Sequence, residues 1–261
     1  MLGRNHPVLR RLRELRREPA RRDAEGVLVA EGPHLVREAL AAGAVIELAV
    51  GSPRLAATAG GLALRRDLER AGVPYHETTE AALEAAQDAR SPQPVVSIVR
   101  RRDLDLGAVL DAARFVVLAH GLQDPGNVGS ILRTADAAGV DALLLAGASA
   151  DPHHPRAVRA SAGSVFRLPV TRGDLATHAA DLARRAFRLV GADPRGDRLL
   201  ADFDWSGRIA IVLGAEGAGL PADLDRALAA RVRIPMRAGI ESLSVAAAAA
   251  ILLFTAKGVR S

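Results

Sequence analysis

The stretch "IAIVLGAEGAGLP", residues 209–221, decides the fold class. Its first five residues are all apolar, which is typical of a strand buried on both faces of a sheet. The strand leads directly into a loop with Gly214, Glu216, Gly217 and Gly219, and such glycines let the backbone approach a ligand closely. The spacing G-x-x-G-x-G, followed by a proline, differs from the fingerprint of dinucleotide-binding folds. The stretch therefore indicates either a ligand-binding loop or a glycine-rich turn with a solvated glutamate.

Similar short apolar runs alternate with helical patterns over the second half of the chain. Strands are predicted at 115–119, 142–146, 188–192, 209–213 and 231–234, and helices at 127–138, 155–161, 174–186, 221–229 and 242–257. This alternation predicts an α/β fold with a parallel sheet that helices cover on both faces. In such folds, ligands bind at the carboxyl ends of the strands, so the loops there are the candidate sites.

The first half of the chain is also α/β in pattern. Strands are predicted at 27–30 and 44–50, and helices at 31–43, 61–71 and 78–87. The segment "SPQPVVSIVRRRDLDLG" (91–107) combines two prolines, a short strand and a charged run, which favours the end of a domain. We therefore expect a smaller α/β domain over residues 1–103, a linker over 104–112 and a larger α/β domain over 113–261.

A second loop, "HGLQDPGNVGSILRTADAAG" (120–139), follows the strand 115–119. Turn residues precede Asn127, which is predicted as the N-cap of a helix with an apolar stripe. Arg133 lies two turns into that helix and off the stripe. The segment is compatible with a capped helix that carries one solvated arginine.

A third loop, "MRAGIES" (236–242), follows the predicted strand 231–234. The helix after it is predicted to begin near Ser242, which could serve as its N-cap. Free N–H groups at a helix start also favour an anionic group. The apolar run Val245–Phe254 that follows indicates a helix buried in the core or at a subunit interface.

Positive charge is concentrated at the amino end of the chain. Residues 1–22 contain eight arginines against Glu14 and Glu18, a net charge of +6, whereas the whole chain is +5. Such a basic segment suits a phosphate backbone, although a solvated surface helix has the same composition. The chain has no cysteine, which excludes disulfides, thiolate metal sites and a cysteine nucleophile.

Several other functional classes find no support in the sequence. The amino-terminal residues contain no apolar segment of the kind found in secretory signals. Val245–Phe254, the longest apolar run, is shorter than the roughly 20 residues needed to cross a bilayer. The motif "DPHHP" (151–155) places two histidines together without a partner motif, so we expect no metal site. We expect a cytoplasmic protein without a membrane segment.

Together, the three loops resemble the SpoU branch of the SPOUT methyltransferases, a family of RNA 2′-O-ribose methyltransferases. The resemblance covers about residues 113–261. It rests on Asn127 with Arg133, on "LGAEGAGL" (213–220) and on "IPMRAGIESLSV" (234–245). The first half also resembles that family's RNA-binding domain through "VLVAEGPHLVREALAAG" (27–43).

The resemblance implies a fold, a cofactor and a partner. The family's parallel sheet ends in a deep trefoil knot, which forms the site for S-adenosylmethionine. The cofactor-binding positions carried over to this chain are Gly214, Ile234, Met236 and Leu243. The family also acts as homodimers on RNA, with ribosomal RNA favoured here because of the additional amino-terminal domain.

The resemblance also implies catalytic residues for methyl transfer to a ribose 2′-hydroxyl. Arg133 takes the position of the family's catalytic arginine. Because a guanidinium stays protonated in proteins, it suits binding of the adjacent phosphate or stabilisation of a developing alkoxide. Glu216 could accept the proton or orient the arginine, and Asn127 and Ser242 would position groups by hydrogen bonds. Ser244 is the fifth candidate catalytic residue.

One residue departs from the family pattern. The family usually has "SLNV" where this chain has "SLSV", so Ser244 replaces an asparagine whose amide both donates and accepts hydrogen bonds. The loss of one hydrogen bond would cost about 1 kcal/mol. This departure leaves open a catalytically weakened RNA-binding or ribosome-assembly protein. A transfer RNA 2′-O-methyltransferase also remains an alternative, because the sequence does not identify the RNA. An unrelated nucleotide-dependent α/β enzyme is disfavoured because the phosphate fingerprint differs.

Overall fold

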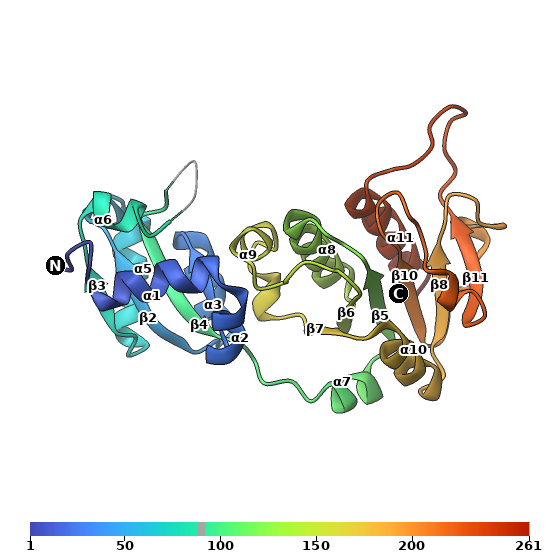
Figure 1. Cartoon of the computed structure of the whole chain (residues 1–261), viewed down its shortest axis with the longest axis horizontal. Coiled ribbons are helices and arrows are strands. Elements are labelled where there is room, and N and C mark those ends of the chain that lie inside the picture. The colour runs from blue at the N-terminus through green and yellow to red at the C-terminus, as the bar shows by residue number, and fades with distance from the viewer. Residues whose placement is uncertain (88–91, 261) are drawn as a thin grey trace. The chain divides into compact units, whose positions relative to one another are not determined.

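The computed structural model of the chain describes residues 1–87 and 92–260 and forms two compact units (Figure 1). The first unit contains Met1–Asp103 together with His153–Phe166, and the second contains Leu104–Pro152 and Arg167–Ser261. Ser91, the first residue of the predicted segment 91–107, and Ser261 lie outside the described residues. The first unit is therefore built from two separate stretches of sequence.

A four-stranded sheet in the order β1-β4-β2-β3 forms the centre of the first unit. Its strands are β1 (Val27–Glu31), β2 (Ile46–Gly51), β3 (Tyr75–Glu77) and β4 (Val95–Arg100). The sequence pattern predicts only a short strand at a domain end in the region of β4. Instead, β4 pairs antiparallel with both β1 and β2, and its residues 95–99 are all buried. The unbroken apolar run in this segment is the signature of such a central strand.

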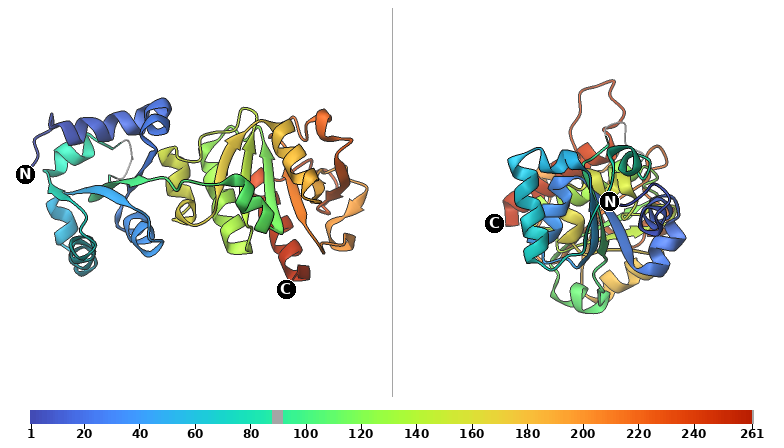
Figure 2. Two further views of the ribbon diagram at one scale, coloured as in Figure 1. Left: turned by 90° about the horizontal axis from the view of Figure 1, so that it is seen from below. Right: turned by 90° about the vertical axis from the view of Figure 1, so that its left-hand side faces the viewer.

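Helices cover both faces of this sheet (Figure 2). They are α1 (Pro7–Arg17), α2 (Pro19–Glu25), α3 (Pro33–Ala41), α4 (Pro53–Ala56), α5 (Ala59–Arg70) and α6 (Glu80–Glu84). Helix α1 buries Leu9, Leu12 and Leu15 against the sheet, and their spacing of three residues places them on one helix face. Much of the basic amino-terminal segment is therefore an ordinary amphipathic helix.

The second stretch of the first unit contains helix α9 (Pro155–Ala160) and the short 3-10 helix η1 (Ser164–Phe166). Helix α9 packs against β1. The guanidinium of Arg159 donates to Glu31 Oε2 at 2.6 Å, and Arg16 Nε lies 2.9 Å from Glu31 Oε1. Only 3% of the Glu31 side chain is exposed. This buried carboxylate therefore joins α1, β1 and α9.

A seven-stranded sheet in the order β7-β6-β5-β10-β8-β11-β9 forms the second unit. Its strands are β5 (Phe115–His120), β6 (Ala142–Ala146), β7 (Val170–Gly173), β8 (Arg188–Ala192), β9 (Arg198–Leu199), β10 (Ile209–Leu213) and β11 (Leu228–Arg233). Every recorded pairing in it is parallel. The predicted α/β class with a parallel sheet is confirmed.

The helices of the second unit lie on the two faces of the sheet (Figure 1). They are α7 (Leu106–Ala112), α8 (Pro125–Ala138), α10 (Leu175–Arg184) and α11 (Val245–Arg260), with the 3-10 helices η2 (Leu200–Asp202) and η3 (Ala222–Leu224). Most of the segment predicted as a linker, 104–112, is helix α7, which buries Leu110 in the core of this unit. Among the described residues, no helix is long and apolar enough to cross a membrane.

One predicted helix is wrong. Residues 221–229 form only the single turn η3, and strand β11 begins at Leu228. The apolar residues Leu224 and Leu228 are four positions apart, as on a helix. However, Leu224 is buried in the core, while Leu228 pairs with β8 as the first residue of a strand. Tertiary pairing therefore overrides the local helical pattern.

Candidate active site

Two of the loops singled out in the sequence emerge side by side. Strands β5 and β10 are neighbours, with Ala119 opposite Leu213, so the loops after them leave the sheet at adjacent points. A Cβ added to Gly121 would lie 2.9 Å from Ala215 Cβ. The loop after β5 thus contacts the loop after β10, and residue 121 must be glycine for them to approach this closely.

The glycine-rich loop after β10 closes tightly on itself. The backbone N–H of Ala215 donates to the carbonyl of Gly219 at 3.0 Å, and the reverse bond measures 2.9 Å. A Cβ on Gly214 would lie 2.1 Å from the Gly219 carbonyl oxygen, a distance that no side chain can occupy. Gly217 and Gly219 have positive φ angles of 84° and 71°, which glycine adopts readily. These glycines fold the loop so that Glu216 lies at its exposed tip.

Asn127 and Glu216 are brought together although 89 positions separate them. The Asn127 side-chain amide donates to Glu216 Oε1 at 2.7 Å. The sequence pattern predicts Asn127 as the N-cap of its helix, and this prediction is wrong. The cap is Asp124, whose Oδ1 accepts from the backbone N–H groups of Gly126 at 2.6 Å and Asn127 at 3.1 Å. Because Asp124 performs the capping, the Asn127 amide is available for the glutamate.

Arg133 lies six residues after Asn127 on α8 and is exposed. Within the described part of the chain, its guanidinium makes no hydrogen bond or ion pair. The structure therefore does not join Arg133 to the Asn127–Glu216 pair. The cationic side chain of Arg133 thus lies on the helix surface, where it is available to an external anion.

The third loop, 236–242, lies within the segment 234–244 that joins β11 to α11 (Figure 1). Ile234 and Met236 are half-buried, whereas Ser242 is exposed and Leu243 is 38% exposed. Helix α11 begins at Val245, three residues after the predicted start at Ser242. Ser244 caps it: its Oγ accepts from the Ala247 N–H at 3.3 Å, and its carbonyl accepts from the Ala248 N–H at 2.9 Å. Capping is thus performed by the residue that departs from the family motif.

Comparison with known proteins identifies the fold around these loops. Residues 114–254 match the SpoU rRNA Methylase family, and residues 6–97 match the MRM3-like substrate binding domain. This chain belongs to the SpoU rRNA methylase family. Its SpoU domain contains all three loops.

Similar proteins match both units of this SpoU family member. The 23S rRNA (guanosine(2553)-2′-O)-methyltransferase RlmP of Bacillus subtilis is 33% identical over 229 residues, which cover 87% of each chain. The AdoMet-bound rRNA methyltransferase from Sinorhizobium meliloti has a TM-score of 0.86 and 30% identity, covering 99% of this chain and 97% of its own. The SpoU methyltransferase AviRb from Streptomyces viridochromogenes, in complex with AdoMet, has a TM-score of 0.85 and 29% identity, covering 97% of each chain.

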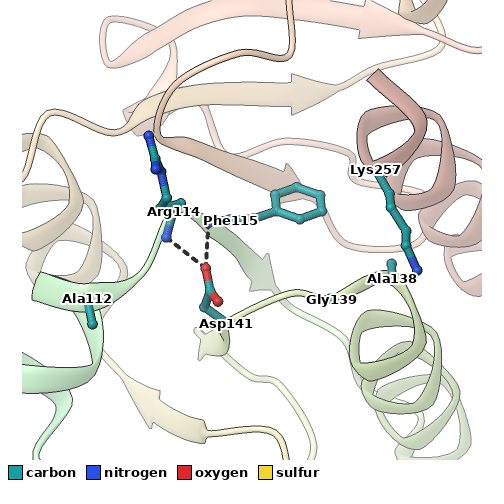
Figure 3. Close-up of a pocket in the computed structure, with 7 residues that line it drawn as sticks. All are labelled: Ala112, Arg114, Phe115, Ala138, Gly139, Asp141 and Lys257. Carbon is teal, nitrogen blue, oxygen red and sulfur yellow. Dashed lines mark hydrogen bonds between the residues drawn. The ribbon is translucent and has the colours of Figure 1, made fainter. Parts of the chain in front are cut away.

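A hollow of about 340 Å³ lies at the opposite end of the SpoU domain, where β5 and β6 begin (Figure 3). It is lined by Ala112, Arg114, Phe115, Ala138, Gly139, Asp141 and Lys257. Asp141 Oδ2 accepts from the backbone N–H groups of Arg114 at 2.7 Å and Phe115 at 2.8 Å, so this carboxylate fixes the start of β5. The lining contains no predicted site residue, and we assign the hollow no part in the candidate site.

Sequence reasoning missed two residues that shape the SpoU site, Gly121 and Asp124. A signal for Asp124 was present, because Pro125 follows it and proline favours the first position of a helix. Gly121 has a positive φ of 70°, but its contact with Ala215 depends on the pairing of two distant strands. No local pattern could have shown that contact.

Proposed function

We propose that this chain transfers a methyl group from S-adenosylmethionine to a ribose 2′-hydroxyl of ribosomal RNA. The observation that carries the proposal is the hydrogen bond between Asn127 and Glu216. It assembles residues of two separate SpoU motifs at the carboxyl ends of β5 and β10, where α/β folds bind their ligands. The similar proteins from Bacillus subtilis and Streptomyces viridochromogenes are named as 2′-O-methyltransferases of 23S rRNA.

The residues proposed to hold the methyl donor fit its chemistry. Gly214 lets its loop close tightly, because a Cβ there would meet the Gly219 carbonyl, and its backbone is proposed to contact the methyl donor. Ile234 and Met236 are half-buried, and Leu243 is exposed, so apolar surface is available to cover a flat base. When bound, S-adenosylmethionine supplies a methyl group on a positively charged sulfur. This chain has to place the ribose hydroxyl in line with that methyl group and remove the proton of the hydroxyl.

Glu216 is the proposed proton acceptor. Asn127 engages Oε1 of the carboxylate, which leaves Oε2 for the ribose hydroxyl. The exposed Arg133 would bind the adjacent phosphate or stabilise the developing alkoxide. The exposed Ser242 would position the substrate by a hydrogen bond. We assign Ser244 to the start of α11 rather than to substrate, because its Oγ caps that helix.

RNA binding is proposed for residues 1–103, with 104–112 as the connection to the methyltransferase residues 113–261. Not all of the basic segment is available for this. Arg11 pairs with Glu25 and Glu47, Arg21 pairs with Glu14 and Glu25, and Arg22 is buried. The exposed arginines of this segment are Arg4, Arg10 and Arg17. These three are the best candidates for contacts to RNA phosphates.

We also propose that the protein acts as a homodimer in the cytoplasm. Helix α11 exposes two large apolar side chains, Ile251 at 40% and Phe254 at 49%. They lie three positions apart, on one face of the helix. A second copy of the chain is the proposed partner for that face. Light scattering of the purified protein tests this, with a monomeric mass as the contradicting result.

The decisive experiment maps ribose methylation in total RNA from cells with and without this protein. The proposal expects one 2′-O-methyl mark in ribosomal RNA to disappear with the protein and to return with purified protein and S-adenosylmethionine. A mark lost from transfer RNA would instead support the alternative substrate. If no mark changes while the protein still binds ribosomal RNA, the chain is a binding or assembly protein.

A further inference from the structure

The loop between β5 and α8 is fixed by one hydroxyl from a different strand end. Ser149 follows β6, and its Oγ accepts from the Leu122 N–H at 3.2 Å. The same hydroxyl donates to the Ala146 carbonyl at 2.6 Å. Ser149 thus uses both its donor and an acceptor position to tie the Leu122 backbone to the end of β6.

The backbone around Ser149 completes this attachment. The Ala150 N–H donates to the Leu122 carbonyl at 2.7 Å, and the Gly121 N–H donates to the Ala146 carbonyl at 3.1 Å. Leu122 is only 2% exposed, so its N–H would have little access to water if the hydroxyl were removed. An unsatisfied buried donor costs about 1–3 kcal/mol, which favours a shift of the loop over an unpaired N–H.

A shift of this loop would reach the candidate site in two ways. Asp124, two residues after Leu122, caps α8 and thereby sets the position of Asn127, which bonds to Glu216. Gly121, on the other side of Leu122, lies against Ala215, the neighbour of Glu216, with no room for a Cβ between them. Both members of the Asn127–Glu216 pair therefore depend on where Leu122 lies.

We infer that Ser149 is a positioning residue for methyl transfer, acting through the loop 121–124 on Asn127 and Glu216. This inference rests on the proposed function, in which those two residues serve the reaction. Ser149 does not touch the pair itself. Its contribution is to hold the carboxylate and the amide in one geometry before the substrate binds, which is where small displacements are costly to the rate.

The test compares two substitutions of similar shape. Both variants add a methyl group on Cβ. Ser149→Thr keeps the hydroxyl beside it, whereas Ser149→Val has a second methyl group in place of the hydroxyl. With ribosomal RNA from cells that lack the protein, Ser149→Val is expected to lower kcat about 10- to 100-fold and to leave the KM for RNA within about twofold. Ser149→Thr is expected to retain most of the wild-type kcat. Unchanged kcat in Ser149→Val, or equal losses in both variants, would overturn the inference.

A second measurement does not depend on activity. The side-chain amide resonance of Asn127, followed by NMR in the full-length protein, is expected to shift in Ser149→Val and to stay near its wild-type position in Ser149→Thr. If the wild-type protein transfers no methyl group, the proposed function fails, but this resonance still reports on Ser149. An unmoved Asn127 resonance in Ser149→Val contradicts the positioning role. If Ser149→Val does not fold, Ser149→Ala takes its place against Ser149→Thr.

Discussion

Arg133 is an exposed cation on α8 without an internal partner among the described residues, so its substitution should leave the fold intact. We expect Arg133→Ala to bind S-adenosylmethionine normally and to lose about 10²–10³-fold in kcat, as when a group that stabilises transition-state charge is removed. Single-turnover methylation of ribosomal RNA measures this. Arg184→Ala, at another exposed arginine of the same unit, is the control. Near-normal turnover in Arg133→Ala would refute the assignment.

Ser244 caps α11, and serine and asparagine are about equally good caps. We therefore expect Ser244→Asn to keep both the stability and the turnover of the wild type within about threefold. Ser244→Ala should lose about 1 kcal/mol of unfolding free energy, because the Ala247 N–H loses its acceptor. Thermal unfolding and steady-state rates measure the two effects. If Ser244→Asn raised turnover manyfold, serine at this position would be a catalytic defect.

His178 lies on α10 and is 3% exposed, and burial lowers the pKa of its imidazole. The unfolded chain therefore binds a proton at higher pH than the folded protein does. The contribution of His178 to the unfolding free energy is therefore most favourable above the unfolded pKa of about 6.5. It is lost as the pH falls toward the lower folded pKa. Below both pKa values, each unit by which the folded pKa lies under the unfolded one lowers the unfolding free energy by about 1.4 kcal/mol.

Urea unfolding at pH 7.5 and pH 5.0 tests this. Wild-type protein is expected to lose more unfolding free energy between these two pH values than His178→Leu, which cannot titrate at this position. Parallel losses in the two proteins would show that the acid sensitivity comes from other groups.

At the residue scale, the sequence predicts which residues form the candidate site better than it predicts what each one does. Asn127 and Glu216 were singled out from separate motifs, and the structure joins them. The cap assigned to Asn127 belongs to Asp124, and the helix start assigned to Ser242 belongs to Val245. Neighbouring polar residues compete for the same backbone N–H groups, and backbone geometry that the sequence does not show decides between them.

At the scale of elements, the buried Glu31 is the feature with the clearest energetic consequence. It pairs with Arg16 on α1 and Arg159 on α9, and removal of its charge leaves two guanidinium groups without that partner. We expect Glu31→Gln to lower the unfolding free energy of the first unit by about 3–5 kcal/mol, as for other broken buried pairs.

Glu77→Gln provides the comparison for Glu31→Gln. Glu77 is 48% exposed and pairs with Arg65, so the loss should stay within about 1 kcal/mol. Chemical denaturation followed by circular dichroism measures both variants. Equal midpoints for the two would show that the Glu31 pairs contribute little more than an exposed pair.

Elements that rest on periodicity alone could be predicted, and those that rest on long-range pairing could not. The strands 115–119, 142–146 and 209–213 are confirmed as β5, β6 and β10 because their apolar runs are complete in themselves. The helix predicted at 221–229 is wrong because Leu228 pairs with β8 as part of strand β11. The trefoil knot implied by the resemblance stays a prediction, since threading has no local sequence signature.

At the scale of the whole molecule, the net charge of +5 arises at the amino end, and only part of that charge is available to a partner. We expect binding of ribosomal RNA to weaken steeply with salt. In the double variant Arg10→Ala and Arg17→Ala, the slope of log K against log salt should fall by about 2. Filter binding from 50 to 200 mM salt measures this.

Arg70→Ala is the matched control, because Arg70 is exposed on α5 of the same unit and pairs with Asp67. Its slope should stay near that of the wild type. A flat salt response of the wild-type protein would exclude the basic segment as the main RNA contact.

The discontinuity of the first unit has a consequence for protein synthesis. A chain emerging from the ribosome folds from its amino end as sequence becomes available. Here the first unit lacks its second stretch, which contains α9, until residue 166 has been made, and residues 104–152 of the other unit are produced in between. Until then, the growing chain carries Glu31 without Arg159 beside it. The two units therefore finish folding as interleaved events, and a gene fragment that stops at residue 103 encodes an incomplete first unit.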